Sequence, residues 1–415
     1  MLYLGKINKE QLKFKEAFDF YSNAINQLDS VWLIHSMNIN YDVFSLVDLY
    51  LKKGNRNLEN EVNKSLDLLA KKDTFKTIKC KAYHYHCLGI IYSYLEEYVK
   101  SNELLNKSLI EYESIQNYEK YFYLEYIASS LGNNYSRIND FSKSEKYFEK
   151  AFVYARKAKM TNDKELFNIW YSAAINSIRS KNYLLATIRL DSASVFSKSI
   201  SNKEYADLYH CYGLTHTKLG NYFKANDCFL KAIKFRKKEK SLDFQNLSRD
   251  YQNYSELLVK MGKQNEAIEM SKESCKLIQQ VMGDKSGSTS QAFSSLGSIY
   301  KECKLYDESM SAYNKAILAA CSDTACNRKL FPEPSSIVYT AEYIKALKGK
   351  ASILYTMITI SSKNNIMYYK QSLLCNLEVI KQLEKLRSSY QFNEGKLLLS
   401  ENEKKCIQGS HSDCI

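Results

Sequence analysis

The chain has 415 residues, with 59 Lys and Arg against 46 Asp and Glu, and its formal net charge is +13. It contains only 13 Gly and 2 Pro, well below the about 7% and about 5% of an average protein. All-β sandwiches and loop-rich α/β enzymes place these residues at most strand ends, so both classes are excluded. We therefore expect an all-α protein that is large enough to bury a substantial core.

The sequence repeats itself at a period close to 42 residues, and three columns of mostly small residues hold this register. The first column, which we call the Gly slot, consists of Gly5, Val47, Gly89, Gly132, Ala174, Gly213, Ser255 and Gly297. The second, twelve residues later, consists of Ala17, Glu59, Ser101, Ser144, Ala186, Ala225, Ala267 and Ser309. The third, nineteen residues after the Gly slot, consists of Ala24, Leu66, Ser108, Ala151, Ala193, Ala232, Ser274 and Ala316. Eight units in one register indicate a repeat protein.

Each unit is expected to form two antiparallel helices. The Gly slot lies where the two helices cross, and there a side chain larger than Ala would push their axes apart. The third column lets the second helix pack against the next unit. Aromatic residues follow the short polar turns, where a ring packs and a hydroxyl reaches the rim; they are Tyr98, Phe141, Tyr183, Tyr222 and Tyr306. We therefore interpret most of the 34 Tyr as structural.

These columns resemble the tetratricopeptide repeat family over about residues 1–318, in its longer variants with 42-residue units. The match is strongest over 89–151 and 213–316 and weakest in the second unit, at Val47, Glu59 and Leu66. The resemblance implies a right-handed superhelical solenoid of antiparallel helix pairs. It also implies that the first helix of each pair lines a concave face, which binds a peptide or a partner protein.

Both prolines, Pro332 and Pro334, follow the last unit, and a helix does not continue through proline. The predicted divisions are a repeat array of about eight helix pairs over 1–328, a linker over 329–338, a C-terminal helical segment over 339–408 and a polar tail over 409–415.

The C-terminal segment resembles the stretch that joins repeat arrays to a caspase-like CHAT peptidase domain in bacterial proteins. The matching residues are 346–351 (ALKGKA), 386–390 (LRSSY) and 395–399 (GKLLL). The resemblance implies that a peptidase would follow, whereas the sequence ends at Ile415, and that this chain is the sensing or docking part of such a system. Met1 lies just before the first Gly slot, which together with the missing peptidase favours a shortened or split coding sequence.

No recognised catalytic or metal-binding pattern is visible. The sequence lacks His-Glu-x-x-His, Gly-x-Ser-x-Gly and a P-loop. His84 and His86 point to different faces of a helix, and we expect few carboxylates around His210 and His216, with acidic residues on solvated faces. Cys321 and Cys326 have no second pair or nearby His to complete a zinc site. We therefore predict that the protein is not an enzyme and binds no cofactor or metal.

The compartment is predicted from what the sequence lacks. No run approaches the about 18 apolar residues of a membrane span, and the start has no apolar stretch of signal-peptide length. Eleven Cys lie singly along helical segments, as is typical of reduced, buried thiols. A cytoplasmic location is the expectation.

Four consecutive units carry a cation five residues after the Gly slot: Arg137, Arg179, Lys218 and Lys260. We expect them to form a basic stripe that attracts an acidic segment or a C-terminal carboxylate of a partner. The alternative is that these cations only complement helix dipoles and stay solvated. Other candidates for the same face are Asn133, whose amide both donates and accepts, and the residues three before the Gly slot, Tyr171, His210 and Gln252.

A basic protein could instead bind nucleic acid non-specifically through phosphate attraction. Acidic residues interleave with the cations throughout, however, and no nucleic-acid signature is present. A protein or peptide partner is therefore the preferred prediction. The sequence does not indicate an oligomeric state.

Overall fold

The computed structural model describes residues 77–94, 96–238, 243–322, 331–332, 334–360 and 365–389. The predictions on the first two units, on Cys326, on residues 390–408 and on the tail lie outside the described residues. Within the described ranges there are 14 α-helices, two short 3-10 turns and an isolated bridge between Cys321 and Ile337. This confirms the all-α fold class.

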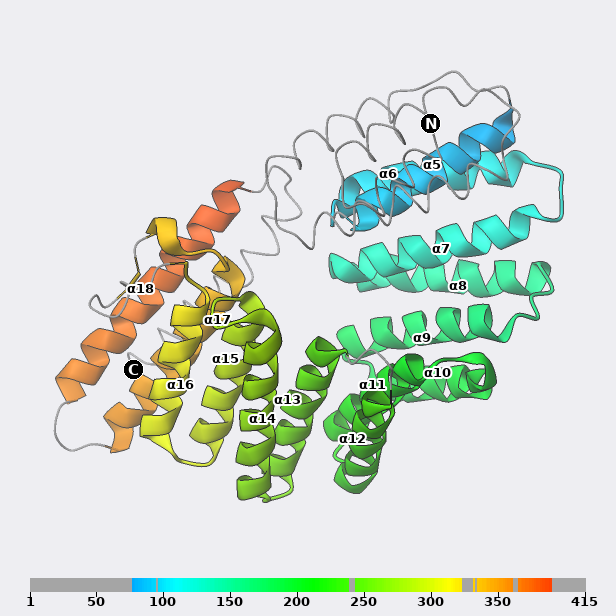
Figure 1. Ribbon diagram of the computed structural model, residues 1–415. Coiled ribbons are helices and arrows are strands. Elements are labelled where there is room, and N and C mark those ends of the chain that lie inside the picture. Colours follow the sequence, from blue (N-terminus) through cyan, green and yellow to red (C-terminus); the bar gives the residue numbers. More distant parts are fainter. Residues whose placement is uncertain are drawn as a thin grey trace. The chain divides into compact units, whose positions relative to one another are not determined.

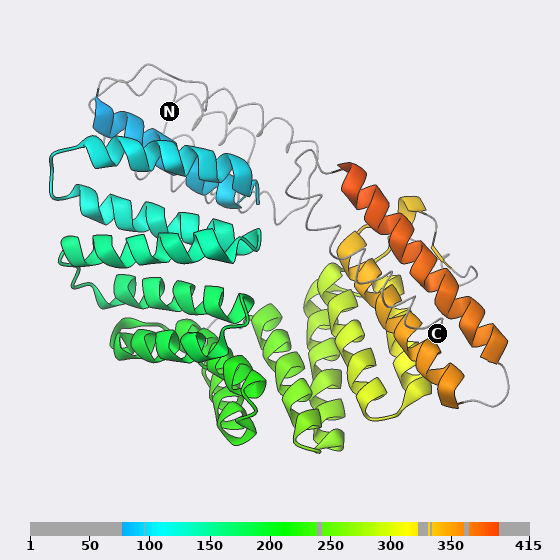
Figure 2. The same cartoon turned by 180° about the vertical axis from the view of Figure 1, so that it is seen from behind.

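The described helices form two compact units, one ending at Ser199 and one beginning at Ile200. The first contains α5 (Ile78–Tyr94), α6 (Tyr98–Ser114), α7 (Lys120–Arg137), α8 (Phe141–Lys157), α9 (Asp163–Arg179), α10 (Tyr183–Val195) and η1 (Ser197–Ser199). The second contains α11 (Asn202–Lys218), α12 (Tyr222–Lys237), α13 (Phe244–Lys260), α14 (Gln264–Met282), α15 (Gly287–Glu302), α16 (Tyr306–Ala319), η3 (Pro334–Ser336), α17 (Thr340–Ile360) and α18 (Asn365–Ser389). Within each unit consecutive helices lie in antiparallel pairs (Figures 1 and 2). The boundary at Ser199 falls inside the predicted repeat array.

The Gly slot brings the two helices of a pair into close contact. A Cβ atom on Gly132 would lie 3.1 Å from the ring of Phe148, and one on Gly213 would lie 2.9 Å from the ring of Phe229. Both rings are fully buried and belong to the second helix of the same pair. The glycine therefore leaves the space that the ring occupies, in agreement with the sequence prediction.

Serines of the second column add a hydrogen bond that the sequence analysis did not anticipate. The hydroxyl groups of Ser101, Ser144 and Ser309 donate to the backbone oxygens of Gly89, Gly132 and Gly297 at 2.6–2.7 Å. All three serines are fully buried, and each hydroxyl has this partner. Serine therefore suits this column for two reasons: its side chain is small, and its buried hydroxyl has a hydrogen-bond acceptor.

The turn inside each described repeat has one residue in the left-handed region. These residues lie seven positions after the Gly slot and are Glu96, Asn139, Lys181, Gly220, Gly262 and Lys304, with φ between 60° and 78°. Glycine adopts this conformation without strain, whereas other residues are disfavoured there. Gly220 and Gly262 are therefore explained by the turn, and the same positive φ recurs where Glu, Asn or Lys replaces glycine.

The first helices of successive pairs also contact each other within a unit. In unit 1, α7 contacts both α5 and α9; in unit 2, α11 contacts α13, α13 contacts α15 and α15 contacts α17. We call the surface that these first helices share the odd-helix face of each unit.

The C-terminal helices continue the pattern of unit 2. Helix α17 packs on α15 and α16 and pairs with α18. Their shared core includes Ala316, Leu347 and Val379. A Cβ atom on Gly349 of α17 would clash with the ring of Tyr313 of α16, which also covers Gly297. The α17–α18 pair is therefore a further layer of the unit, and the predicted divisions at 328, 338 and 408 stay predictions.

No described helix is long and apolar enough to cross a membrane.

Candidate functional site

The odd-helix face of unit 2 gathers three lysines around one carboxylate. Lys218 ends α11, Lys260 ends α13, and Glu256 lies one turn before Lys260. Lys345, from α17, is the third cation that acts on Glu256. Glu256 keeps contact with solvent, yet the surrounding protein reduces its hydration and raises the pKa of its carboxyl, while the three lysines act to lower it.

The three lysines are available to a ligand. Each is exposed, and none has a side-chain hydrogen bond or an ion pair within the part of the chain that the structure describes. Around Glu256, three positive charges face one negative charge, so this part of the face keeps an excess of positive charge that an acidic segment would complement.

Arg137 and Arg179 occupy the same repeat position in unit 1 but differ in their contacts. The Nε atom of Arg179 donates to the backbone oxygen of Ser136 at 3.2 Å, and its Nη2 donates to Oδ1 of Asn139 at 3.2 Å. Arg179, which ends α9, therefore binds the C-terminal end of α7, where a cation complements the helix dipole. Burial and the charge of Arg137 lower the pKa of Arg179. Arg137 is exposed and has no side-chain hydrogen bond among the described residues.

Asn133 and Tyr171 lie on the first helices of unit 1, as expected. Asn133 is exposed on α7. Tyr171 is half-buried on α9 and stacks on Phe167, with ring centroids 5.5 Å apart. Asn133 is thus the more accessible of the two.

His210 is part of a buried ionic network, contrary to the expectation that carboxylates are sparse around it. Its Nδ1 lies 2.7 Å from Oδ1 of Asp250, and its Nε2 lies 3.2 Å from the amide of Asn253. Asp250 is fully buried. The expectation that acidic residues occupy only solvated faces is therefore also wrong.

The second partner of Asp250 is Arg236, from α12. Its Nε donates to Oδ2 of Asp250 at 2.6 Å, and its Nη2 donates to Oδ1 of Asp207 at 2.8 Å. Burial alone would lower the pKa of Arg236, but the hydrogen bonds and charges of Asp250 and Asp207 raise it on balance. The network therefore joins α11, α12 and α13 and gives the ring of His210 a structural role.

Gln252 is also buried, and its polar atoms are used inside the protein. Its Nε2 lies 3.2 Å from the hydroxyls of Ser248 and Ser274, and its Oε1 accepts from Ser295 at 3.1 Å. His210 is 4% exposed and Gln252 is 7% exposed. These two side chains do not form part of the accessible odd-helix face. Ligand binding by the eight candidate residues from the sequence analysis stays a prediction.

Sequence reasoning missed Glu256 and Lys345. Glu256 directly follows the Gly slot at Ser255, just as Asn133 follows Gly132, so the repeat alignment contained a signal for it. Lys345 lies beyond the aligned units and had no such signal.

The described residues show no arrangement suited to metal or thiol chemistry. Among them, no group of three His, Cys, Asp or Glu side chains could hold a metal ion. Cys87, Cys228, Cys275, Cys303 and Cys375 form no disulfide. Burial raises the pKa of the Cys87 and Cys275 thiols to about 12, so both are protonated at neutral pH.

Comparison with known proteins identifies a repeat within this fold. The sequence model of a family described as tetratricopeptide repeat matches residues 290–320, which cover most of α15 and all of α16. The chain thus contains a tetratricopeptide repeat, and the resemblance to that family is confirmed for this stretch. The relation to CHAT proteins and the 42-residue unit stay predictions.

Comparison with solved structures finds similar chains at low sequence identity. A Rap protein complexed with Competence and Sporulation Factor is 12% identical, with 91% of this chain and 99% of that chain covered and a TM-score of 0.48. BtubC from P. vanneervenii is 13% identical, with 62% and 92% covered and a TM-score of 0.42. YrrB, described as a TPR protein with an unusual peptide-binding site, is 16% identical, with 46% and 84% covered and a TM-score of 0.31. No curated protein matches the chain in sequence.

Proposed function

We propose that this protein is a non-catalytic interaction module that binds an acidic segment of a partner protein on the odd-helix face of unit 2. The observation that carries the proposal is the group of Lys218, Lys260 and Lys345 around Glu256, because the three ammonium groups are exposed and outnumber the carboxylate. Asn133 and Arg137 extend the proposal to unit 1, whereas the contacts of Arg179 support a role in packing.

Binding of an acidic peptide tests the proposal directly. The probe is a fluorescein-labelled peptide of alternating Glu and Ser, followed by anisotropy at physiological salt. Lys218→Glu/Lys260→Glu removes two attractive charges and introduces two repulsive ones. Each exposed pair is worth about 0.5–1 kcal/mol, so we expect binding to weaken about tenfold or more.

A matched control separates this face from general charge. Lys224→Glu/Lys234→Glu makes the same change of charge on α12, where both lysines are exposed. We expect this variant to bind within about twofold of wild type, since its charges lie outside the odd-helix face. Equal weakening by both variants, or no binding by wild type, would contradict the proposal. Tighter binding of a DNA oligonucleotide than of the peptide would favour the nucleic-acid alternative instead.

The more specific form of the proposal is that the module docks in a CHAT-type protease system. Its support is the likeness at residues 346–351, which lie in α17. Ala346, Leu347 and Ala351 are buried there, so these residues also have a packing role. Size-exclusion chromatography with a purified CHAT peptidase domain checks this form: co-elution is expected, and separate elution at micromolar concentration would reject it.

A further inference from the structure

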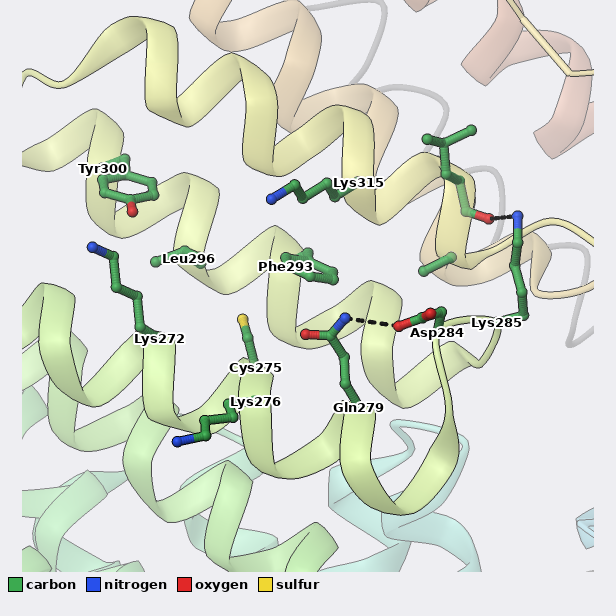
Figure 3. A pocket seen from close by; sticks show the side chains of 12 residues that line it. Lys272, Cys275, Lys276, Gln279, Asp284, Lys285, Phe293, Leu296, Tyr300 and Lys315 are labelled. Carbon is green, nitrogen blue, oxygen red and sulfur yellow. Dashed lines mark hydrogen bonds between the residues drawn. The ribbon is translucent and has the colours of Figure 1, made fainter. Parts of the chain in front are cut away.

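Unit 2 has a second surface feature, a pocket of about 600 Å³ bounded by α14, α15 and α16. Its floor is apolar and includes Cys275, Phe293 and Leu296 (Figure 3). Its rim carries four lysines, Lys272, Lys276, Lys285 and Lys315. The volume lies within the range typical of ligand pockets.

Small side chains at two repeat positions open this pocket. Cys275 and Leu296 lie 42 residues after Ile233 and Tyr254, which occupy the equivalent positions between α12 and α13. There Ile233 and Tyr254 are buried in one core cluster, and the hydroxyl of Tyr254 donates to Asn226 at 2.9 Å. The same backbone positions that are filled in one repeat are therefore occupied by smaller side chains in the next.

The charge of the rim also differs from that of the preceding repeat. Lys272 and Lys315 lie 42 residues after Leu230 and Glu273. Two positive charges thus appear at the pocket where the preceding repeat has an exposed leucine and a carboxylate. Smaller side chains and two additional positive charges therefore occur at the same place. Packing of the core requires neither change.

The two ends of the pocket differ in how far their polar groups are already paired. At one end, Nζ of Lys285 donates to the backbone oxygen of Leu318 and the amide of Gln279 donates to Asp284, both at 2.8 Å. At the other end, the hydroxyl of Tyr300 and the ammonium of Lys272 lie beside the apolar floor (Figure 3).

Lys315 extends over the floor between these ends, with its Nζ 5.7 Å from the ring centroid of Phe293. Lys276 lies on the α14 side of the rim, 3.9 Å from Glu273. The open end therefore presents ammonium groups and a hydroxyl next to apolar surface.

We propose that this pocket binds an acidic peptide segment of a partner protein that inserts one large apolar side chain. The side chain lies on Cys275, Phe293 and Leu296. Carboxylates beside it in the peptide accept hydrogen bonds from Lys272, Lys315 and Tyr300. Charge complementarity selects this occupant, because a neutral apolar ligand would reduce the hydration of the ammonium groups without pairing them.

This site is separate from the odd-helix face and does not depend on the function proposed for it. On α15, Phe293, Leu296 and Tyr300 line the pocket. The helical period places Ser298 and Glu302 on the other side of α15, in line with Glu256 and Lys260 of α13. Burial also raises the pKa of the Cys275 thiol to about 12 although Lys315 acts to lower it, so the floor stays uncharged at neutral pH.

Selection from a displayed library of random short peptides tests the inference. The library is selected on the full chain and counter-selected on Cys275→Ile, which puts the residue of the preceding repeat into the floor. We expect retained peptides to share one large apolar residue with Asp or Glu beside it. A retained pool without this combination, or an empty pool, would overturn the inference.

Synthetic copies of the retained peptides then give affinities for designed variants. We expect Cys275→Ile and Lys272→Glu/Lys315→Glu each to weaken binding at least about tenfold, with Leu296→Tyr as a second filling variant. The matched control is Lys234→Glu, at the position equivalent to Lys276 in the preceding repeat, which should bind within about twofold of wild type.

Lys218→Glu/Lys260→Glu distinguishes this site from the odd-helix face and should leave these peptides bound. Circular dichroism and thermal unfolding show whether each variant is folded. Undiminished binding by folded Cys275→Ile and Leu296→Tyr would reject the pocket, whatever the outcome at the odd-helix face.

Discussion

Two buried acidic side chains, one in each unit, differ in the partners that surround them. Asp250, on α13 of unit 2, is fully buried and contacts the guanidinium of Arg236 and the ring of His210. Glu125, on α7 of unit 1, is 5% exposed and receives a hydrogen bond from Ser129 at 2.7 Å. Among the described residues, Glu125 has no ion pair.

The difference in partners determines the protonation of Glu125. Burial raises its pKa to about 7, Ser129 acts to lower it, and the charge of Glu165 raises it further. A cation at hydrogen-bond distance, such as Arg236 provides for Asp250, would favour the charged form. The comparison teaches that a cation at hydrogen-bond distance distinguishes a buried acid that stabilises the fold as a carboxylate from one whose pKa is raised by burial.

Loss of the cation beside Asp250 is the largest expected effect. Arg236→Met leaves a buried carboxylate with only His210 beside it, and breaking a buried ion pair in this way costs about 3–5 kcal/mol. Urea unfolding at pH 7 measures this change. Asp207→Asn is the milder control, because Asp207 is partly exposed and Arg236 keeps its contacts with Asp250. A loss below about 1 kcal/mol for Arg236→Met would show that the network adds nothing to stability.

The double variant Arg236→Met/Asp250→Leu sharpens this test. Replacing both charges with apolar groups removes the uncompensated carboxylate, and such replacements are often neutral. We expect the double variant to be more stable than Arg236→Met alone. A further loss would mean that the shape of the network, rather than its charge balance, holds α12 against α13.

Glu125, which has no ion pair among the described residues, predicts that the free energy of unfolding depends on pH. The folded pKa of Glu125, about 7, lies above the ordinary value of 4.5, so the folded protein binds this proton more tightly than the unfolded chain does. Its contribution is full below about pH 4.5 and is lost as pH rises through about 7, to a total of about 3–4 kcal/mol.

Glu125→Gln removes this titration and tests the assignment. We expect the variant to exceed the wild type in free energy of unfolding at pH 8 and to match it at pH 4, as measured by urea unfolding across that range. Parallel pH profiles of the two proteins would contradict the raised pKa. Glu103→Gln, at an exposed position on α6, controls for the change of charge.

The repeat columns made the fold predictable from sequence, because each column corresponds to a contact that recurs among the described repeats. Gly132 and Gly213 are small for the same reason, the ring of the paired helix. The hydrogen bonds of Ser101 and Ser144 to the Gly-slot carbonyls were not predicted. A column that contains both Ala and Ser indicates that the side chain must be small, and it does not show that a hydroxyl is used.

The functional surface was less predictable, because it depends on contacts that do not recur. Asp250 pairs with Arg236 and His210, and no other repeat within the described residues has this set, so no column indicates it. The position of Lys218 on the odd-helix face follows from the period, whereas the role of Arg179 in binding the end of α7 depends on its rotamer. The pocket at Cys275 was hidden because the columns record what units share, and it arises where one unit departs from its neighbour.

The smallest expected effect concerns the single hydrogen bond that Glu125 receives. Ser129→Ala removes the donor at 2.7 Å, so the carboxylate form loses its partner while the protonated form loses less. The pKa of Glu125 should rise further, and stability at pH 8 should fall by about 1 kcal/mol, with little change at pH 4. In a Glu125→Gln background the same substitution should no longer depend on pH. If its effect still depends on pH, Ser129 acts on another titrating group. The stability that unit 1 gains at low pH would then not come from protonation of Glu125, and the contrast with the paired Asp250 of unit 2 would need another explanation.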